Sequence, residues 1–240
     1  MSGHSHWAGI KHRKGINDAK RAKIFTKLAK PIVIAARNGG NPDTNFKLRL
    51  AIDKAREYNM PRENIDRAIA RGAGSGKDGV HIEELVYEAF GPGNSAILIK
   101  ASTENKNRTV SEIKSLLTKN NGKFVPTGSV AFLFREVGEI TIDCPEKKRE
   151  SLELSAIEAG ADDTDFDETE STLFVYTPLS NLQSVRESLE KNNITTKSSE
   201  ITYRPTEYIQ LSEIDRASFE NLCEKLDEHD DVDEIYDNVH

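Results

Sequence analysis

The chain has 240 residues, 36% of them hydrophobic and 30% charged, which is enough for one to three domains with a packed core. No window approaches the roughly 20 uninterrupted apolar residues of a membrane-spanning helix. Residues 1–15 lack the apolar stretch of a secretory signal. Cys144 and Cys223 are too few for a disulfide framework and too far apart for a CxxC metal site. We therefore expect a cytoplasmic protein that makes no membrane contact.

The net charge of −7 conceals two segments of opposite sign. Residues 1–77 contain 17 Lys and Arg against 6 Asp and Glu, a net charge of +11. Residues 78–240 contain the other 16 basic residues against 34 acidic ones, a net charge of −18. Because phosphates attract a basic segment whatever their sequence, this asymmetry indicates nucleic-acid binding by an overall acidic chain.

Residues 1–15 are predicted to form an arm, since they contain three glycines and show no helical or strand periodicity. Its basic residues, which we expect to contact phosphates, are Lys11, His12, Arg13 and Lys14. Trp7 is its one large aromatic residue. The ring either stacks on an unpaired base or anchors the arm to the helices that follow.

A small helical domain is predicted next, from apolar residues that recur near the 3.6-residue period. Pro31 is expected to kink or break the first helix near Lys30. The predicted helical segments are residues 18–30, 32–37, 45–58 and 61–71. The bases that we expect to contact nucleic acid from this domain are Lys20, Arg21, Lys23, Lys27, Arg37, Lys47, Arg49, Lys54 and Arg56. The simpler alternative for such charges is a solvated helix surface.

Strands and helices alternate after a glycine-rich linker at residues 73–79. Thr109 and Glu112 have the spacing of a capping box for one of these helices. The predicted strands are residues 83–90, 96–102, 129–135, 139–143, 163–167, 172–176, 195–203 and 232–236. The predicted helices are residues 109–120, 145–159, 179–192 and 212–228.

The order of elements predicts an α+β fold with one α/β domain inserted in another. Residues 137–204 show the β-α-β-β-α-β order of a ferredoxin-like unit. Residues 205–240 are too short to fold alone, and residues 80–135 have strands with only one helix to cover them. We therefore expect the two segments to form one discontinuous α/β domain. Residues 1–77 make up the basic arm and helical domain.

Catalytic and metal motifs are weak throughout the chain. The segment around Gly72 and Gly76 lacks the spacing, the Ser or Thr and the preceding strand of a P-loop. Asp163, Asp165 and Asp167 are not followed by the Gly and Glu of a calcium loop. The three histidines of the arm have no accompanying thiol or ordered carboxylate. We predict no catalytic residues, no metal site and no cofactor.

A series of motifs resembles the YebC family along nearly the whole chain. Among them are Gly3-His4-Ser5-His6-Trp7-Ala8, Ile10-Lys11-His12-Arg13-Lys14, Asn59-Met60-Pro61, Gly91-Pro92-Gly93, Glu158-Ala159-Gly160-Ala161 and Asp230-Asp231-Val232. The resemblance implies a helical domain followed by two α/β domains. Bacterial members are described as probable transcriptional regulators that bind DNA in the cytoplasm, and some are tied to the ribosome. Mitochondrial relatives are translational activators.

The sequence thus predicts a non-enzymatic, DNA-binding transcriptional regulator that is a monomer. The alternative is a ribosome-associated translational activator that binds ribosomal or messenger RNA, because one basic surface suits either polyanion. We expect the acidic α/β domains to bind a protein partner. An enzyme or small-ligand sensor lacks a supporting site, and a pure protein scaffold would have no affinity for polyanions.

Overall fold

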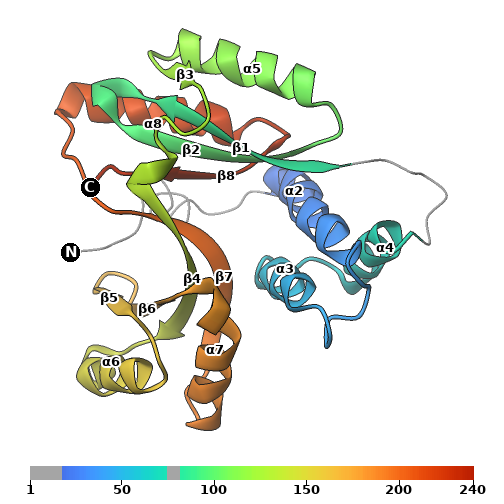
Figure 1. Ribbon diagram of the computed structural model, residues 1–240, viewed down its shortest axis with the longest axis vertical. Helices are drawn as coiled ribbons and strands as arrows, with labels where there is room; N and C mark the ends of the chain where they lie inside the picture. The colour runs from blue at the N-terminus through green and yellow to red at the C-terminus, as the bar shows by residue number, and fades with distance from the viewer. Residues whose placement is uncertain (1–17, 75–81) are drawn as a thin grey trace.

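The computed structural model describes residues 18–74 and 82–240 of the chain. The predicted arm and most of the predicted linker lie outside these ranges. The described residues form a helical region followed by two four-stranded antiparallel sheets (Figure 1). This arrangement confirms the predicted α+β fold class.

Three helices make up the N-terminal region: α2 (Asp18–Ala36), α3 (Phe46–Glu57) and α4 (Arg62–Gly72). The Asn45 side chain caps α3 by accepting a hydrogen bond from the Leu48 N–H at 3.1 Å. A Cβ atom at Gly72 would lie 2.3 Å from the carbonyl oxygen of Val33, so α4 needs glycine there to approach α2. The apolar core of this region includes Ile32, Val33, Ala36, Leu48, Ile52, Ala55, Ile65 and Ala68.

Of the kink or break predicted near Lys30, the break does not occur, because α2 continues through Pro31 to Ala36. Proline has no N–H and removes one hydrogen bond to the preceding turn. However, Ile32, Val33 and Ala36 are all buried in the core of the helical region. Their packing stabilises the second half of the helix and outweighs the local preference of proline.

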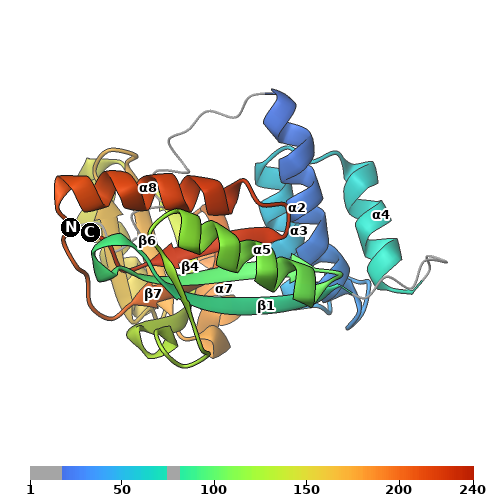
Figure 2. The same cartoon turned by 90° about the horizontal axis from the view of Figure 1, so that it is seen from above.

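The first sheet has the strand order β3-β1-β2-β8. Its strands are β1 (Glu83–Phe90), β2 (Ala96–Thr103), β3 (Lys123–Val125) and β8 (Val232–Asp237), with the short helix η1 (Pro92–Asn94) between β1 and β2. Helices α5 (Lys106–Lys119) and α8 (Glu213–Asp227) cover one face (Figure 2). Side chains such as Ile97, Ile113 and Phe219 form the core between sheet and helices.

Two local predictions in this region are wrong. The cap of α5 is Asn105, which accepts a hydrogen bond from the Arg108 N–H at 3.1 Å, so Thr109 lies inside the helix and forms no capping box. In the predicted strand 129–135, the first residues form a bend and the short helix η2 (Ala131–Leu133), and only the last two belong to a strand, β4 (Phe134–Asp143). The buried Glu88 carboxylate accepts hydrogen bonds from the N–H groups of Gly128, Val130 and Ala131 at 2.6–2.9 Å, which curls the backbone there.

The second sheet has the order β5-β6-β4-β7 and confirms the predicted ferredoxin-like unit. Its strands are β4 (Phe134–Asp143), β5 (Asp163–Asp167), β6 (Thr172–Thr177) and β7 (Thr196–Pro205). Its helices are α6 (Arg149–Glu158) and α7 (Leu182–Lys191), preceded by the short helices η3 (Glu146–Lys148) and η4 (Leu179–Asn181). The whole unit lies in sequence between β3 and β8 of the first sheet.

The helical region contacts both sheets. Leu50 and Phe46 of α3 join the apolar core of the second sheet, and α2 packs against β8 of the first. Cys144 and Cys223 are free thiols in two different cores. Within residues 18–74 and 82–240, no helix combines the length and the apolar character that a membrane crossing requires.

Replacing Pro31 with alanine should stabilise the protein. An interior proline costs about 3 kcal/mol relative to alanine in a helix, so Pro31→Ala should raise the free energy of unfolding by about 1–3 kcal/mol. Urea denaturation of both proteins measures the difference. A loss of stability would show that packing of the proline ring matters more than the missing hydrogen bond.

Candidate nucleic-acid interface

The structure does not describe every residue predicted to contact nucleic acid. Trp7, Lys11, His12, Arg13 and Lys14 lie outside the described residues. Lys20 and Arg21 belong to α2, but their side chains are also outside the description. The geometry therefore concerns the remaining predicted bases, which come from α2, α3 and the loop between them.

The lysines of α2 face the acidic turn, residues 227–231, which connects α8 to β8. Lys23 Nζ lies 3.0 Å from a carboxylate oxygen of Asp230 and donates to a backbone carbonyl of the same turn. Lys27 Nζ lies 3.7 Å from the Asp227 carboxylate and donates to the carbonyl of that residue. This face, predicted to contact phosphates, is occupied by acids of the same chain.

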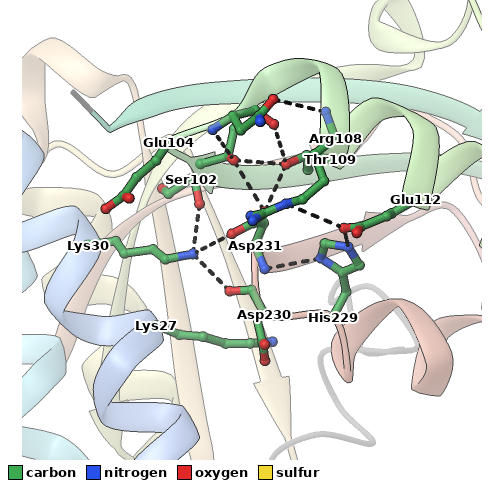
Figure 3. A network of polar contacts seen from close by, with 12 residues as sticks. Lys27, Lys30, Ser102, Glu104, Arg108, Thr109, Glu112, His229, Asp230 and Asp231 are labelled. Carbon is green, nitrogen blue, oxygen red and sulfur yellow. Dashed lines mark hydrogen bonds and ion pairs between the residues drawn. The ribbon is translucent and has the colours of Figure 1, made fainter. Parts of the chain in front are cut away.

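Asp231 joins α2 to the first sheet (Figure 3). Lys30 donates to the carbonyl oxygens of Ser102 and Asp230, both at 2.8 Å, and to Asp231 Oδ1 at 3.1 Å. The other carboxylate oxygen of Asp231 accepts from the Arg108 guanidinium at 2.7 Å and from the Thr109 hydroxyl at 2.8 Å. One carboxylate thus connects α2, α5 and the start of β8.

The protonation of Asp231 follows from these contacts. Asp231 is 5% exposed, and burial alone would raise the pKa of its carboxyl group. Hydrogen bonds from Arg108, Thr109 and Lys30, with the charge of Lys30, reverse this effect and lower the pKa to about 2. The carboxylate therefore stays ionised, and its ion pairs persist over the physiological pH range.

Glu112, His229 and Asp231 lie close enough to be considered as metal ligands, with candidate atoms within 4.8 Å of one another. His229 Nε2 already lies 2.9 Å from the Glu112 carboxylate, and its Nδ1 accepts the Asp231 N–H at 3.1 Å (Figure 3). A cation there would also compete with the two basic side chains on Asp231. We therefore assign this group to the ion-pair network and not to a metal site.

Lys54 of α3 forms a second junction, where the helical region meets both sheets. Its ammonium group pairs with Glu200 of β7 and Glu234 of β8. Burial alone would lower the pKa of Lys54, but the two carboxylates raise it well above its ordinary value. The pKa of Glu234 is lowered, because Lys54 and Lys100 outweigh the effect of burial. This lysine is therefore a charged structural contact between three parts of the fold.

Asp233 lies in sequence between Asp231 and Glu234, which belong to the two junctions, but it forms no ion pair with a basic side chain of the described residues. Neither of its carboxylate oxygens, both buried, has a hydrogen-bond partner among the described residues. Burial, with the charge of Glu234, raises the pKa of Asp233 to about 6, although the nearby Ser102 hydroxyl and the charges of Lys30 and Lys100 act in the opposite direction. This side chain therefore disfavours the folded state once it is ionised.

The other predicted bases have mixed surroundings. Arg37 donates to the carbonyl oxygen of Ile82 at 2.8 Å. The Arg49 guanidinium lies 5.4 Å from the centre of the Phe46 ring. Arg56 has a side chain that is 70% exposed, in a loose pair with an aspartate of its own helix. The Lys47 side chain is exposed as well, so Lys47 and Arg56 are the predicted residues that solvent reaches most readily.

Exposed arginines on α4 were not among the predicted contact residues. Arg62 is 92% exposed at the side chain, and Arg67 and Arg71 are exposed too. The sequence signal was available, because these residues lie outside the apolar stripe of Ile65 and Ala68. Arg62 and Arg71 make surface ion pairs with acids, whereas α4 leaves Arg67 facing solvent.

The fold and charges define a class of α+β protein in which a basic helical region is paired with acidic antiparallel sheets. Comparison with protein families gives this class a name. A model described as the TACO1/YebC protein N-terminal domain matches residues 5–75, and one described as the TACO1/YebC second and third domain matches residues 82–239. The chain belongs to the TACO1/YebC family, which confirms the resemblance seen in its motifs.

Individual relatives agree with this assignment. A probable transcriptional regulatory protein of Caldanaerobacter subterraneus subsp. tengcongensis is 46% identical over 100% of this chain and 98% of its own length. A protein of the same description from Chloroflexus aurantiacus is 45% identical, over 100% of this chain and 95% of its own. The crystal structure of a conserved hypothetical protein from Aquifex aeolicus matches with a TM-score of 0.88 and 40% identity, covering 98% of this chain and 97% of that one.

Removing the charge of Asp231 should destabilise the protein strongly. Asp231→Asn leaves Lys30 and Arg108 without their carboxylate, and breaking a buried ion pair costs about 3–5 kcal/mol. The matched control is Asp230→Asn, at a side chain that is 82% exposed. An exposed pair contributes less than about 1 kcal/mol. Urea denaturation at pH 7 compares the two variants, and equal losses would contradict the central position of Asp231.

Replacing Asp233 should have the opposite effect, and the effect should depend on pH. An acid whose pKa is raised in the folded state stabilises that state below its unfolded pKa, near 4, and loses this contribution as the pH rises through about 6. The free energy of unfolding of Asp233→Asn, relative to wild type, should therefore increase by about 2 kcal/mol from pH 4 to pH 7.5. This value allows for partial solvent access to the carboxyl group. Denaturation at both pH values measures it. A difference independent of pH would refute the raised pKa.

Proposed function

We propose that this chain is a nucleic-acid-binding regulator of gene expression, and that it binds DNA through its basic N-terminal arm and helical region. The observation that carries the proposal is the charge of +11 on residues 1–77. The names of the relatives, which describe probable transcriptional regulatory proteins, support a regulatory role. We propose no catalytic activity, since the site described above consists of ion pairs without a nucleophile or a substrate cavity.

We divide the basic residues into two groups. Lys23, Lys27 and Lys54 pair with acids of the same chain, so we assign them to the contact between helices and sheets. We assign phosphate binding to the arm and to the exposed cations. These are Lys11, His12, Arg13, Lys14, Lys47, Arg56 and Arg67, with Trp7 as the aromatic contact.

We also propose a division of labour along the chain. Residues 1–77 act as the binding domain, residues 80–135 with 205–240 as a discontinuous α/β domain, and residues 137–204 as an inserted domain. Contacts from the acidic domains to a protein partner would direct the bound regulator. The protein would act as a cytoplasmic monomer.

The second candidate function is a ribosome-associated translational activator that binds structured RNA. The sequence carries no helix-turn-helix signature that would assign the reading of bases in the major groove to a particular helix. A basic surface that contacts phosphates alone suits RNA as well as DNA. The choice between the two rests on the relative affinities for the two polymers.

Changing Lys11, Arg13 and Lys14 together to alanine should weaken binding to unrelated sequences alike. The slope of log K against log salt should decrease in magnitude by roughly 2 to 3, at about 0.9 per lost contact on duplex DNA or 0.7 on single strands. Fluorescence anisotropy with a DNA duplex and an RNA hairpin of equal length measures both affinity and slope. Tighter binding to the duplex at equal salt supports the transcriptional role, and tighter binding to the hairpin supports the translational one.

The matched control changes Lys147, Lys148 and Lys191 to alanine, because it removes the same charge from exposed positions outside residues 1–77. It should bind as wild type does. Absence of binding by the wild-type protein to either polymer would refute the proposed function. An unchanged slope of log K against log salt in the arm variant would show that the arm does not contact phosphates.

A further inference from the structure

A local reversal of charge lies within the acidic part of the chain. Residues 106–123 contain five basic residues and one acid, although residues 78–240 together carry a charge of −18. The basic residues are Lys106, Arg108, Lys114, Lys119 and Lys123. Arg108 turns toward Asp231, and Lys106 is the first residue of α5, while Lys114, Lys119 and Lys123 lie farther along α5 and on β3.

A shallow hollow of about 620 Å³ opens between the C-terminal half of α5 and strand β3. It is lined by Lys114, Thr118, Gly122, Lys123, Phe124, Val125 and Pro126, and no acidic residue is among them. The ammonium group of Lys114 lies 4.8 Å from the centre of the Phe124 ring, which holds it at the wall of the hollow. The Phe124 ring in turn packs near Tyr87, at 5.9 Å between centroids, so the hollow has a fixed apolar base.

These lysines differ from the lysines of α2 in one decisive respect. Within residues 18–74 and 82–240, Lys114, Lys119 and Lys123 make no ion pair with a carboxylate, and all three are exposed. The three described lysines of α2 are each paired with a residue of the acidic turn. A chain rich in acids has therefore left this cluster unneutralised and open to an external anion.

The position of the hollow separates it from the N-terminal region. Strand β3 is one edge of the first sheet, and β8, against which α2 packs, is the other edge. Figure 1 shows α5 and β3 on the side of the sheet away from α3 and α4. A polymer that contacted both the helical region and this hollow would span the first sheet.

We infer that the surface formed by Lys114, Thr118, Lys119 and Lys123 is a second contact site for the phosphate backbone of a nucleic acid. This inference rests on the proposed function and adds a place and a set of residues to it. Lys114 and Lys123 line an open hollow, and the exposed Lys119 follows its lining residue Thr118 in α5. Separate ammonium groups of this kind match an extended polyanion, whereas a small anion would require convergent donors in an enclosed site. The contact is independent of base sequence, because the lysines can neutralise phosphates without reading base edges.

A competing explanation is that the lysines protect the exposed edge of β3 from pairing with another chain. Charged side chains on short edge strands serve this purpose in many proteins. The two explanations differ in a measurable way, since edge protection requires no affinity for phosphates.

The test is the full-length variant Lys114→Gln, Lys119→Gln, Lys123→Gln, measured by fluorescence anisotropy on a 30-nucleotide RNA and a 30-base-pair DNA duplex. The control variant is Lys147→Gln, Lys148→Gln, Lys191→Gln, which loses the same charge at other exposed positions. Loss of three phosphate contacts should weaken binding at least about tenfold at 0.1 M salt and reduce the salt slope by roughly 2 to 3. The control should bind as wild type does. A third variant, with arginine at the three positions, should restore both values.

The outcomes separate this inference from the proposed function. If wild type binds and the glutamine variant binds equally well, the second site is refuted while the proposed function stands. If wild type binds neither polymer, both are refuted. Aggregation of the glutamine variant with unchanged affinity of its monomeric fraction would establish edge protection instead. If circular dichroism shows that the triple variant folds poorly, the double variant Lys119→Gln, Lys123→Gln is measured in its place. Its salt slope should decrease in magnitude by roughly 1 to 2.

Discussion

The fold depends on the burial of one carboxylate between two cations. Asp231 is 5% exposed, and such a group is costly to bury unless its charge is compensated. Lys30 from α2 and Arg108 from α5 supply the compensation, and the Thr109 hydroxyl completes it. The carboxylate can be satisfied only if helix, sheet and acidic turn have already come together. Its burial therefore favours one arrangement of the helical region on the sheets. Lys54 acts in the same way at the contact with the second sheet, where its charge is compensated by Glu200 and Glu234.

This constraint changes how the charge asymmetry should be understood. A segment of net charge +11 joined to one of −18 neutralises part of itself within the molecule. The lysines of α2 that lie nearest the acidic turn are used in this way, and their availability to phosphates is reduced accordingly. Exposed bases remain on α3, on α4 and at the α5–β3 hollow, among other places. Under the proposed function, affinity for nucleic acid depends on the cations left over after folding, and it cannot be estimated from net charge alone.

The sequence was most informative where structure depends on neighbouring residues. Helical periodicity located α2, α3 and α4, and the order of strands and helices identified the ferredoxin-like unit, because both signals are local. Pro31 and the turn at Gly128 were misjudged because buried contacts with distant residues decide them. The same limit applied to the candidate site. Charge counting found the basic segment, but Lys23 and Glu228 are 205 positions apart, and no local pattern indicated that they meet.

Chemical acetylation of lysines, followed residue by residue by mass spectrometry, tests this account most directly. In the free protein, Lys27 and Lys30, with side chains 12% and 15% exposed, should react slowly and should not change when nucleic acid is added. Lys47, Lys114, Lys119 and Lys123 should react rapidly and become protected by nucleic acid. Rapid reaction of Lys27 and Lys30 in the free protein, with protection by nucleic acid, would contradict the account. It would show that the lysines of α2 are available to phosphates and are not held by the acidic turn.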